Sequence, residues 1–591
     1  MTIIAGYLWV SQLARRYEQA VAVNGNTTAA LLEQLPTLQV ASAALQKVAL
    51  DNEYPDHVKH IAVLGPTQSG KSTIVNVVLD THAASASALA GFTVHTQGYA
   101  STVNASDAQY VNSMMAPLQR TAANTLTSDR LDCYVLEQVG TGKNSMVGNA
   151  IVWDTPDFDS ISANSYSLAV LKTTALSDVA MVVVSKDKYG DKRVWDMLAL
   201  LKSLGKPLLV CINKLDDADR AVVENAFITR YRELFGEPVP TLVVLPFVRH
   251  DASTQSLLSE IQITQHLQEA LHLMDANSDS SDLISHCQQF IRQHEAQWLE
   301  PLVTEVNARE HWMQMIQRSI DEAEEYYANN YLDNPDKYET FNRTLAELLT
   351  LLEIPGVAPA LAQARKLITW PARKLLGVGR NALGRVSDQQ RNASGQVTDQ
   401  EAMVLEQILD TTLVRLQREL LEISGEPWWH TLNSHLRDEL PAIRGRYLLA
   451  SEQARREFEP EIEKAAASLY EQLKEQPALL NTLRAARASA DAAGIALAVK
   501  SGGLAPTDLI LAPAMLSVTT LLTESALGRY LDSVKRNLKK RQREHIKTRL
   551  LEKTLASELR NMTTQLDSAD VLSHDLEADL KKRLEEYRGK H

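Results

Sequence analysis

The sequence predicts an α/β domain, built on a mainly parallel sheet with helices on both faces, joined to a long all-α helical bundle. Two observations carry this prediction across the 591 residues. Between residues 57 and 275, short β-branched runs alternate with helical stretches, which is the pattern of parallel βαβ units. Beyond residue 283, strand signals nearly vanish, and Leu, Ala, Glu, Lys and Arg recur at helical spacing.

The expected elements follow one another along the chain. Residues 1–56 form two helices, because the polar turn at 24–26 interrupts one helical pattern and Thr27-Thr28 can cap the next. A polar, turn-forming stretch at 275–282 is the expected domain boundary. Five strands are expected between these points, at 58–64, 150–153, 179–184, 207–212 and 241–245.

Bulk composition narrows the classes of function. The net charge of -13 argues against a general nucleic-acid binder, so no nucleic-acid partner is expected. The chain has three widely spaced cysteines, Cys133, Cys211 and Cys287. An odd number at this spacing suits a reducing compartment rather than a set of disulfides or a zinc site. The N-terminal stretch lacks the basic region and cleavage site of a signal peptide, and no run of 18 apolar residues is present. We expect a cytoplasmic protein, with peripheral membrane contact as an alternative.

The stretch IAVLGPTQSGKSTIVNVVLD, residues 61–80, contains the pattern G-x-x-x-x-G-K-[ST] between an apolar run and a helical one. Glycines in such a loop let backbone N–H groups surround phosphate oxygens, and the helix N-terminus adds its positive dipole end. Lys71 would reach the β- and γ-phosphates, and the Ser72 hydroxyl would ligate Mg²⁺. The alternative is a glycine turn that binds nothing. The candidate phosphate-binding residues are Gly65, Pro66, Thr67, Gln68, Ser69, Gly70, Lys71, Ser72 and Thr73.

A second motif, Asn213-Lys214-Leu215-Asp216, ends a later apolar run. The Asp216 carboxylate can accept hydrogen bonds from guanine N1–H and from the 2-amino group. Adenine has neither donor, so Asp216 would select guanine. Asn213 would tie the loop together, and the Lys214 stem would cover the base. GTP or GDP is therefore the expected ligand, and a P-loop ATPase is the weaker alternative.

A third motif places acidic residues between these two. Asp154 ends an apolar run and is expected to hold Mg²⁺ through water. Where the usual pattern D-x-x-G has a glycine, this chain has Asp157, and a carboxylate near the γ-phosphate is unfavourable unless it points away. A switch threonine is expected before Asp154. Thr96 is favoured over Thr93, and either can instead be a strand-edge threonine. The expected metal ligands are Ser72, Thr96 and Asp154.

Two segments of the helical region differ from ordinary core helix. Residues 364–386 contain basic residues, a tryptophan and no acidic residue, which suits an anionic membrane surface. The alternative is a basic helix packed on an acidic face of its own bundle. Residues 494–528 contain an uncharged run between Asp508 and Glu524, which is either a hairpin inserted shallowly in a bilayer or a buried core hairpin. The basic run at 535–543 is interpreted as a solvated helix face.

The motifs at Gly65–Ser72, Asp154–Asp157 and Asn213–Asp216, flanked by helical regions, resemble those of bacterial dynamin-like GTPases. The helical regions match that family only in their order and composition. The resemblance implies three parts, with a membrane-binding tip near 364–386 or 494–528 in the last. These parts are N-terminal helices of a neck bundle (1–56), a GTPase domain (57–275) and a helical neck and stalk (276–591).

The same resemblance implies Mg²⁺-dependent GTP hydrolysis coupled to membrane association or remodelling, with vesicle-linked secretion as one setting. It also implies a G-domain dimer or a partner dynamin-like subunit. Members of the family often use a loop glutamine to orient water, and here that glutamine is Gln68, one residue later than in eukaryotic dynamins. With Asp157, this shift predicts weak or partner-dependent hydrolysis. The expected catalytic residues are Gln68, Lys71, Ser72 and Thr96. The alternative function is a GTP-dependent scaffold whose helical region binds proteins rather than lipid.

Overall fold

The computed structural model divides the chain into two compact units, one formed by Met1–Glu305 with Ala569–His591, the other by Val306–Ser568. The residues that it describes are 6–23, 29–84, 94–127, 130, 132–141, 145–158, 163–215, 219–246, 267–269, 271, 281–335, 337–352, 399–423, 427–483, 520, 522–524, 527–566 and 572–590.

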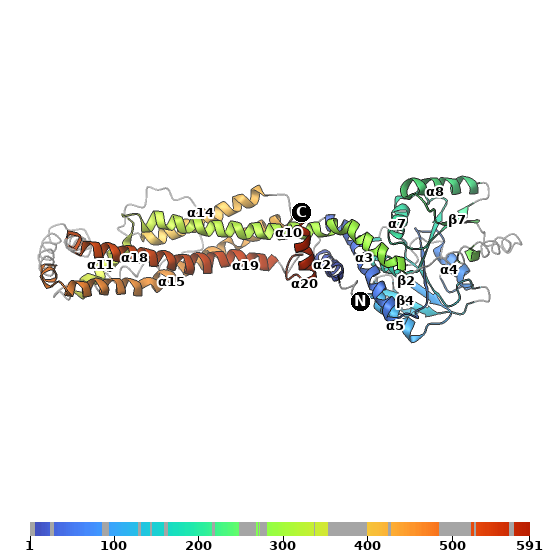
Figure 1. Cartoon of the computed structure of the whole chain (residues 1–591), viewed down its shortest axis with the longest axis horizontal. Helices are drawn as coiled ribbons and strands as arrows, with labels where there is room; N and C mark the ends of the chain where they lie inside the picture. Colours follow the sequence, from blue (N-terminus) through green and yellow to red (C-terminus); the bar gives the residue numbers. More distant parts are fainter. Residues whose placement is uncertain are drawn as a thin grey trace. The chain divides into compact units, whose positions relative to one another are not determined.

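An eight-stranded sheet forms the centre of the first unit (Figure 1). Its strands follow the order β3-β4-β2-β5-β1-β6-β7-β8, and only β2 and β5 pair in antiparallel fashion. The mainly parallel sheet predicted from the sequence is therefore confirmed, while β2, β3 and β4 were not expected. The strands are β1 His60–Leu64, β2 Thr96–Ala100, β3 Gln119–Thr121, β4 Cys133–Gln138, β5 Ile151–Asp154, β6 Val179–Ser185, β7 Leu208–Leu215 and β8 Thr241–Pro246.

Helices cover both faces of this sheet, because alternate strand residues point to opposite sides. Ile61 and Val63 of β1 pack in one core layer with α4, whereas Ala62 and Leu64 pack in the other layer with residues of α6, α7 and α8. The loop Gly65–Ser72, called the P-loop below, therefore leads from a strand buried on both faces into a helix of the first layer. The helices of this domain are α4 Lys71–Leu79, α5 Ala105–Met115, η1 Ala123–Thr125, α6 Ala163–Leu176, α7 Lys192–Ser203 and α8 Arg220–Phe235.

Helices from both ends of the chain belong to the same unit. The two expected N-terminal helices are confirmed as α2 (Leu8–Val23) and α3 (Ala29–Glu53), and α2 packs against α3 and against α20 (Ala578–Arg588). The first part of α10 (Ser281–Tyr327) joins them, since Tyr17 Oη donates to the Trp298 carbonyl oxygen at 2.7 Å. The other side of α3 packs against α6 and α5 of the domain that contains the sheet.

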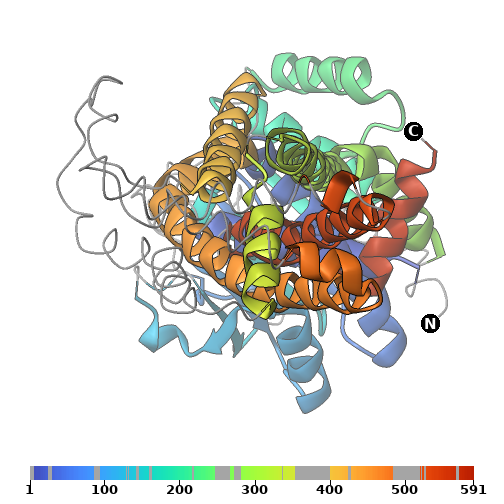
Figure 2. The same cartoon turned by 90° about the vertical axis from the view of Figure 1, so that its left-hand side faces the viewer.

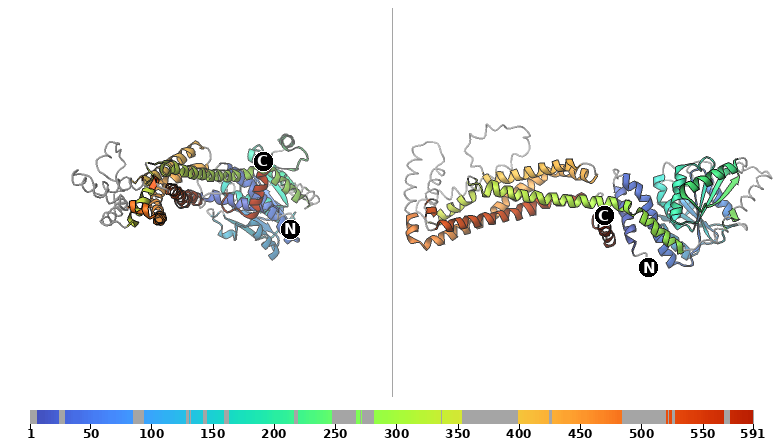
Figure 3. Two further views of the ribbon diagram at one scale, coloured as in Figure 1. Left: turned by 60° about the vertical axis from the view of Figure 1, so that its left-hand side comes forward. Right: turned by 45° about the horizontal axis from the view of Figure 1, so that its top comes forward.

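The second unit is helical throughout the residues described, as the sequence predicts (Figure 2). The long helix α15 packs against α11, α14, α18 and α19, and it lies beside α18 in each view (Figure 3). A buried polar network crosses the bundle, because Tyr327 Oη and Gln542 Nε2 both donate to Glu401 Oε1, at 2.6 and 2.8 Å. The remaining elements are η2 Ala328–Leu332, α11 Glu339–Leu351, α14 Gln400–Glu422, α15 Pro427–Lys474, α18 Gly528–Ile546, η4 Lys547–Ala556 and α19 Ser557–Leu566.

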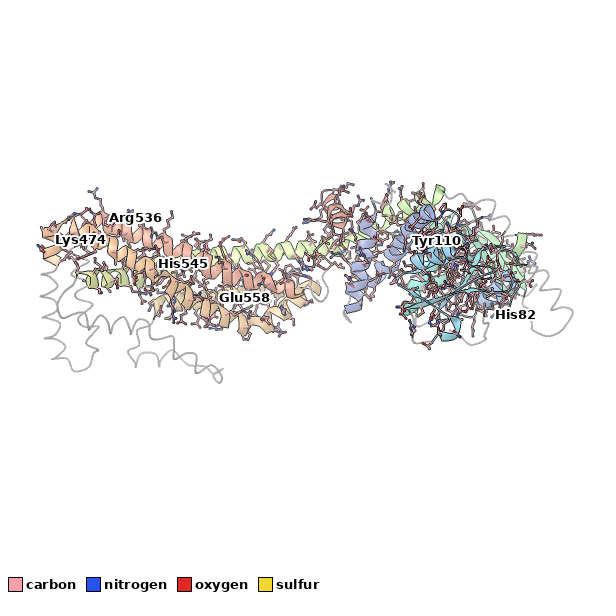
Figure 4. The ribbon with its side chains drawn as sticks, turned by 90° about the horizontal axis from the view of Figure 1, so that it is seen from below. His82, Tyr110, Lys474, Arg536, His545 and Glu558 are labelled. Carbon is pink, nitrogen blue, oxygen red and sulfur yellow. The ribbon has the colours of Figure 1, made fainter. Side chains whose placement is uncertain are left out.

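The basic run at 535–543 lies on α18, which continues through η4 to α19 along the stretch marked by His545 and Glu558 (Figure 4). Arg541 and Arg543 remain largely exposed, as expected of a solvated face, but they pair with Glu461 and Glu324 of the same unit, at 2.5 and 2.7 Å. The run therefore contributes to the bundle itself.

The two candidate membrane segments are largely beyond what the structure describes. Residues 364–386 lie outside the described residues, as does 494–528 apart from 520, 522–524 and 527–528. Within the described parts of the chain, no helix combines the length and apolar character needed to cross a membrane. The membrane interpretation of both segments therefore stays a prediction from sequence.

Candidate functional site

The loop Gly65–Ser72 follows β1 and leads into α4, as its sequence predicts. Two glycines are required by close approaches: a Cβ at Gly65 would collide with the Val183 carbonyl oxygen of β6, and one at Gly70 would collide with Asn213 Nδ2. Gly70 also has a φ of 96°, a left-handed value that favours glycine. Gln68 shares the left-handed region, at φ 60°. The loop is therefore compact and wrapped at the N-terminus of α4, where backbone N–H groups can meet an anion.

Asn213 and Lys214, at the end of β7, hold this loop from the side. Asn213 Nδ2 donates to the Ser69 carbonyl oxygen at 3.0 Å, and Lys214 Nζ donates to the Gln68 carbonyl oxygen at 2.8 Å. Asn213 Oδ1 accepts a hydrogen bond from the Lys214 N–H at 2.9 Å, which fixes the turn between them. The second motif is thus joined directly to the first. Asp216, the predicted base-selecting residue, lies outside the described residues.

Ser72 and Asp154 meet at the same edge of the sheet, where β5 ends. Ser72 Oγ donates to Asp154 Oδ2 at 2.6 Å. Burial raises the pKa of the Asp154 carboxyl to about 6, although the Ser72 hydrogen bond and the Lys71 charge act in the opposite direction. Asp154 Oδ1 is buried and has no hydrogen-bond partner among the described residues. A hydroxyl beside a buried carboxylate oxygen with unused acceptor capacity is a donor set that suits Mg²⁺.

Lys71 and Asp157 form an ion pair inside the loop. Lys71 Nζ contacts Asp157 Oδ1 and also donates to the Pro66 carbonyl oxygen at 3.2 Å. Only 5% of Lys71 and 7% of Asp157 is exposed. The carboxylate that replaces the usual glycine therefore points toward the P-loop lysine rather than away from it, which the sequence alone did not indicate.

The two candidate switch threonines have different positions. Thr96 is the first residue of β2, fully buried, and its Oγ1 has no hydrogen-bond partner among the described residues. It stands opposite Tyr134 of β4, and the next residue, Gln97, stands opposite Asp154 of β5. Thr96 is therefore at the same sheet edge as Asp154, within a strand. Thr93 lies outside the described residues.

Other predicted residues occupy the loop or its immediate surroundings. Pro66 and Ser69 are buried, and the buried Ser69 Oγ has no hydrogen-bond partner in the described part of the chain. Thr67 is half-buried and Thr73, in the first turn of α4, is exposed. Unpaired buried hydroxyls are rare in folded proteins, so the one at Ser69 suits a site that receives a polar ligand.

Thr155 is a positioning residue that was not predicted from the sequence. Its Oγ1 donates to the Val63 carbonyl oxygen at 2.8 Å, and the side chain is fully buried. This bond ties the segment after β5 to β1, and so determines where Asp157 lies relative to the P-loop. Its sequence signal was slight, because Thr155 is one more polar residue in the run DTPD.

Comparison with known proteins agrees with the geometry of the loop. Residues 60–214 match a family model described as 50S ribosome-binding GTPase. No curated protein matches the chain. Two solved chains of an oligomerised bacterial dynamin pair, described as providing a mechanism for the long-range sensing and tethering of membranes, are similar at 12% identity and a TM-score of 0.33. They align over 95% of this chain and over 95% and 98% of their own. The family match and the sheet together show that this chain contains a GTPase domain of the P-loop class.

Proposed function

We propose that this chain is a dynamin-like protein that binds GTP and GDP with Mg²⁺ and hydrolyses GTP weakly or with the help of a partner. The observation that carries the proposal is the direct connection of the P-loop to Asn213 and Lys214, through Ser69 and Gln68. In this site Lys71 and the loop N–H groups hold the phosphates, while Ser72 and Asp154 hold the metal, which neutralises phosphate charge when it is bound. Thr96 remains the proposed third metal ligand.

Nucleotide binding by the full chain tests the first part. A fluorescent GDP should bind with Mg²⁺, should be displaced by GTP or GDP, and should resist ATP, because only guanine offers two donors to Asp216. Lys71→Ala should abolish binding, whereas Asp216→Ala should remove the preference for guanine over adenine. Equal displacement by ATP and GTP would refute guanine selection.

The position of α3 supports communication between the nucleotide site and the helices. α6 begins at Ala163, shortly after Asp157, and α3 packs along α6 within the same unit. At the far end of α6, Asp178 pairs with Lys47 of α3, with 2.8 Å between Oδ1 and Nζ. A change in the segment after Asp154 can therefore reach α3 through one helix. This arrangement suits a dynamin-like GTPase, in which nucleotide state acts on a helical neck.

We propose an anionic membrane surface as the partner of residues 364–386, and of 494–528 if that segment inserts. Full-length chain should co-sediment with vesicles containing anionic lipid, and Arg373→Glu with Lys374→Glu should release it. A matched control is Lys581→Glu with Lys582→Glu, which reverses two exposed charges on α20. Equal sedimentation of both double variants would exclude the basic segment as the lipid contact. Failure of the wild-type chain to sediment would favour the alternative, a GTP-dependent scaffold for proteins.

Hydrolysis is a separate prediction. Gln68 stands in the P-loop at a shifted position, so we expect slow turnover by the chain alone and faster turnover on vesicles or with a second dynamin-like subunit. Phosphate release should be measured for wild type and Lys71→Ala, with and without vesicles. If the two chains release phosphate equally under both conditions, the proposed function reduces to nucleotide binding. We also propose that the chain is related to the enterotoxin-secretion member of the bacterial dynamin-like family.

A further inference from the structure

The ion pair between Lys71 and Asp157 is the feature of the site that the proposed function does not use. Both side chains are almost fully buried, and the Lys71 ammonium has one further partner in the described residues, the Pro66 carbonyl oxygen at 3.2 Å. A buried ammonium without a carboxylate partner costs several kcal/mol. The Asp157 carboxylate therefore stabilises the loop when no phosphate is present.

We propose that the Asp157 carboxylate takes the place of the terminal phosphate of a nucleoside triphosphate, and so biases this site toward the diphosphate. The inference rests on the proposed function, because it assumes that the loop binds guanine nucleotides. A P-loop lysine serves the β- and γ-phosphates. A carboxylate and a phosphoryl oxygen are both anionic acceptors, so each can satisfy the same ammonium.

Charge decides which nucleotide can share the lysine with Asp157. A diphosphate leaves the terminal position empty, so Lys71 can contact the β-phosphate while it keeps Asp157. A triphosphate brings further negative charge to the position held by the carboxylate, and two anions at contact distance repel strongly in a buried site. Binding of GTP therefore requires the Lys71–Asp157 pair to separate, whereas binding of GDP does not.

The backbone limits how easily Asp157 can withdraw. Two residues before it, Thr155 is fully buried and its Oγ1 is bonded to Val63 of β1 at 2.8 Å. Pro156, which is also buried, connects the two and fixes its own φ. The carboxylate is thus presented to the loop by a short, anchored segment, and its displacement opposes triphosphate binding.

The test compares the affinities of full-length chains for GDP and for a non-hydrolysable GTP analogue, with Mg²⁺. Asp157→Asn keeps the shape of the side chain and removes its charge, and Asp157→Gly restores the residue usual at this position. Asp532→Asn, at an exposed position of α18, is the matched control for loss of one negative charge. Wild type and control should bind GDP more tightly than the analogue.

Asp157→Asn should raise affinity for the analogue about tenfold or more, which is ~1.4 kcal/mol, while affinity for GDP changes less than about threefold. A second readout needs no nucleotide: the midpoint of thermal unfolding of the free chain should fall in Asp157→Asn and stay unchanged in Asp532→Asn, because Lys71 loses its partner.

Three results would overturn the inference. An unchanged ratio of the two affinities in Asp157→Asn, or a selective loss of analogue binding, would show that Asp157 does not compete with the terminal phosphate, and guanine binding would still stand. If neither wild type nor any variant binds a guanine nucleotide, the proposed function itself is wrong. A wild-type chain that binds the triphosphate analogue more tightly than GDP would also refute the inference. If Asp157→Asn fails to fold, Asp157→Gly provides the same comparison of affinities.

Discussion

Lys47 of α3 is expected to hold the N-terminal helices onto the GTPase domain, and Lys47→Met tests this. The side chain is 2% exposed, and its Nζ lies 2.8 Å from Asp178 Oδ1 and 3.1 Å from Asp51 Oδ2. Tyr110 of α5, labelled in Figure 4, donates from Oη to Asp51 Oδ1 at 2.6 Å. Methionine would fill a similar volume without the charge, so the variant leaves two carboxylates beside an apolar side chain.

The expected loss of folding stability in Lys47→Met can be estimated from the pKa of Asp178. Burial would raise the pKa of this carboxyl, but the charge of Lys47, the interactions with His60 and the hydrogen bonds outweigh it and lower the pKa from 3.8 to about 2. The difference corresponds to ~2.4 kcal/mol of stability. Because the folded pKa is depressed, this stability is complete above pH ~4 and is lost as pH falls from 3.8 toward 2. Lys47→Met should forfeit most of it at neutral pH.

Thermal unfolding of the full chain should therefore begin about 5 to 10 °C lower in Lys47→Met than in wild type at pH 7. Amide hydrogen exchange in residues 29–53 should rise, which assigns the loss to α3. Lys582→Met, at an exposed position of α20, is the control for loss of one positive charge. The reasoning would be refuted if Lys47→Met and Lys582→Met unfolded alike at pH 7. It would equally be refuted by a deficit as large near pH 2.5 as at pH 7.

Three further predictions concern the same domain. Burial lowers the pKa of the Lys206 ammonium from 10.5 to about 7, so the folded chain binds that proton less tightly than the unfolded chain does. The folded chain is therefore stabilised as pH rises from 7 to 10.5. Between pH 7 and 9.5, the free energy of unfolding measured in urea should rise by about 3 kcal/mol more in wild type than in Lys206→Met. Asn213→Ala removes the bonds to Ser69 and Lys214, each worth about 1 kcal/mol, so the unfolding temperature of the free chain should fall, and GDP affinity measured by fluorescence should fall roughly 5- to 30-fold because the loop is less well ordered. Gly65→Ala should abolish nucleotide binding because its Cβ would collide with Val183, whereas Gly140→Ala, in open space, should bind GDP as wild type does.

The strands β5, β1, β6, β7 and β8 could be predicted from the sequence, and β2, β3 and β4, which lie together beyond β5, could not. β1, β6 and residues 209–212 of β7 are buried on both faces, so each contains a continuous apolar run that is recognisable by itself. β2 is the sequence TQGYA, whose polar and glycine residues disfavour a strand in isolation. β2 forms a strand because of its neighbours in the sheet. It pairs with β4 and β5, and Gly98 leaves the space that the Trp153 ring occupies. That space exists only after the sheet forms.

The loop Gly65–Ser72 could be predicted because its residues are adjacent in sequence, but its partners could not. Asn213, for example, donates a hydrogen bond to the Ser69 carbonyl oxygen of this loop. The pair between Lys71 and Asp157 joins residues from two separate motifs, and neither motif indicates where the Asp157 side chain points. The basic run of α18 is similar, because the acids that pair with it come from α10 and α15. Pairing across elements is set by packing, which a single sequence does not specify.

Several buried charged groups at the amino ends of the strands have partners within the domain, whereas three buried oxygens at the carboxyl ends have none among the residues described. At the amino ends of the strands, Lys47 pairs with Asp178, and Lys206 donates to the carbonyl oxygens of Ala175 and Ser177. Unpaired buried atoms occur there too, among them His60 Nε2, on a ring that is uncharged because burial lowers its pKa to about 3, and Asp107 Oδ2, whose companion Oδ1 accepts from the Val58 N–H at 3.4 Å.

Near the carboxyl ends of the parallel strands, three buried oxygens have no hydrogen-bond partners among the residues described: Ser69 Oγ, Thr96 Oγ1 and Asp154 Oδ1. A folded domain that pairs its charges at one edge would gain by pairing these as well, since each unsatisfied buried group costs about 1–3 kcal/mol. Leaving them unpaired is explained if a polar ligand completes them. Lys71 is the exception at these carboxyl ends, because it has a partner, Asp157, and the terminal phosphate of a triphosphate would have to displace that carboxylate.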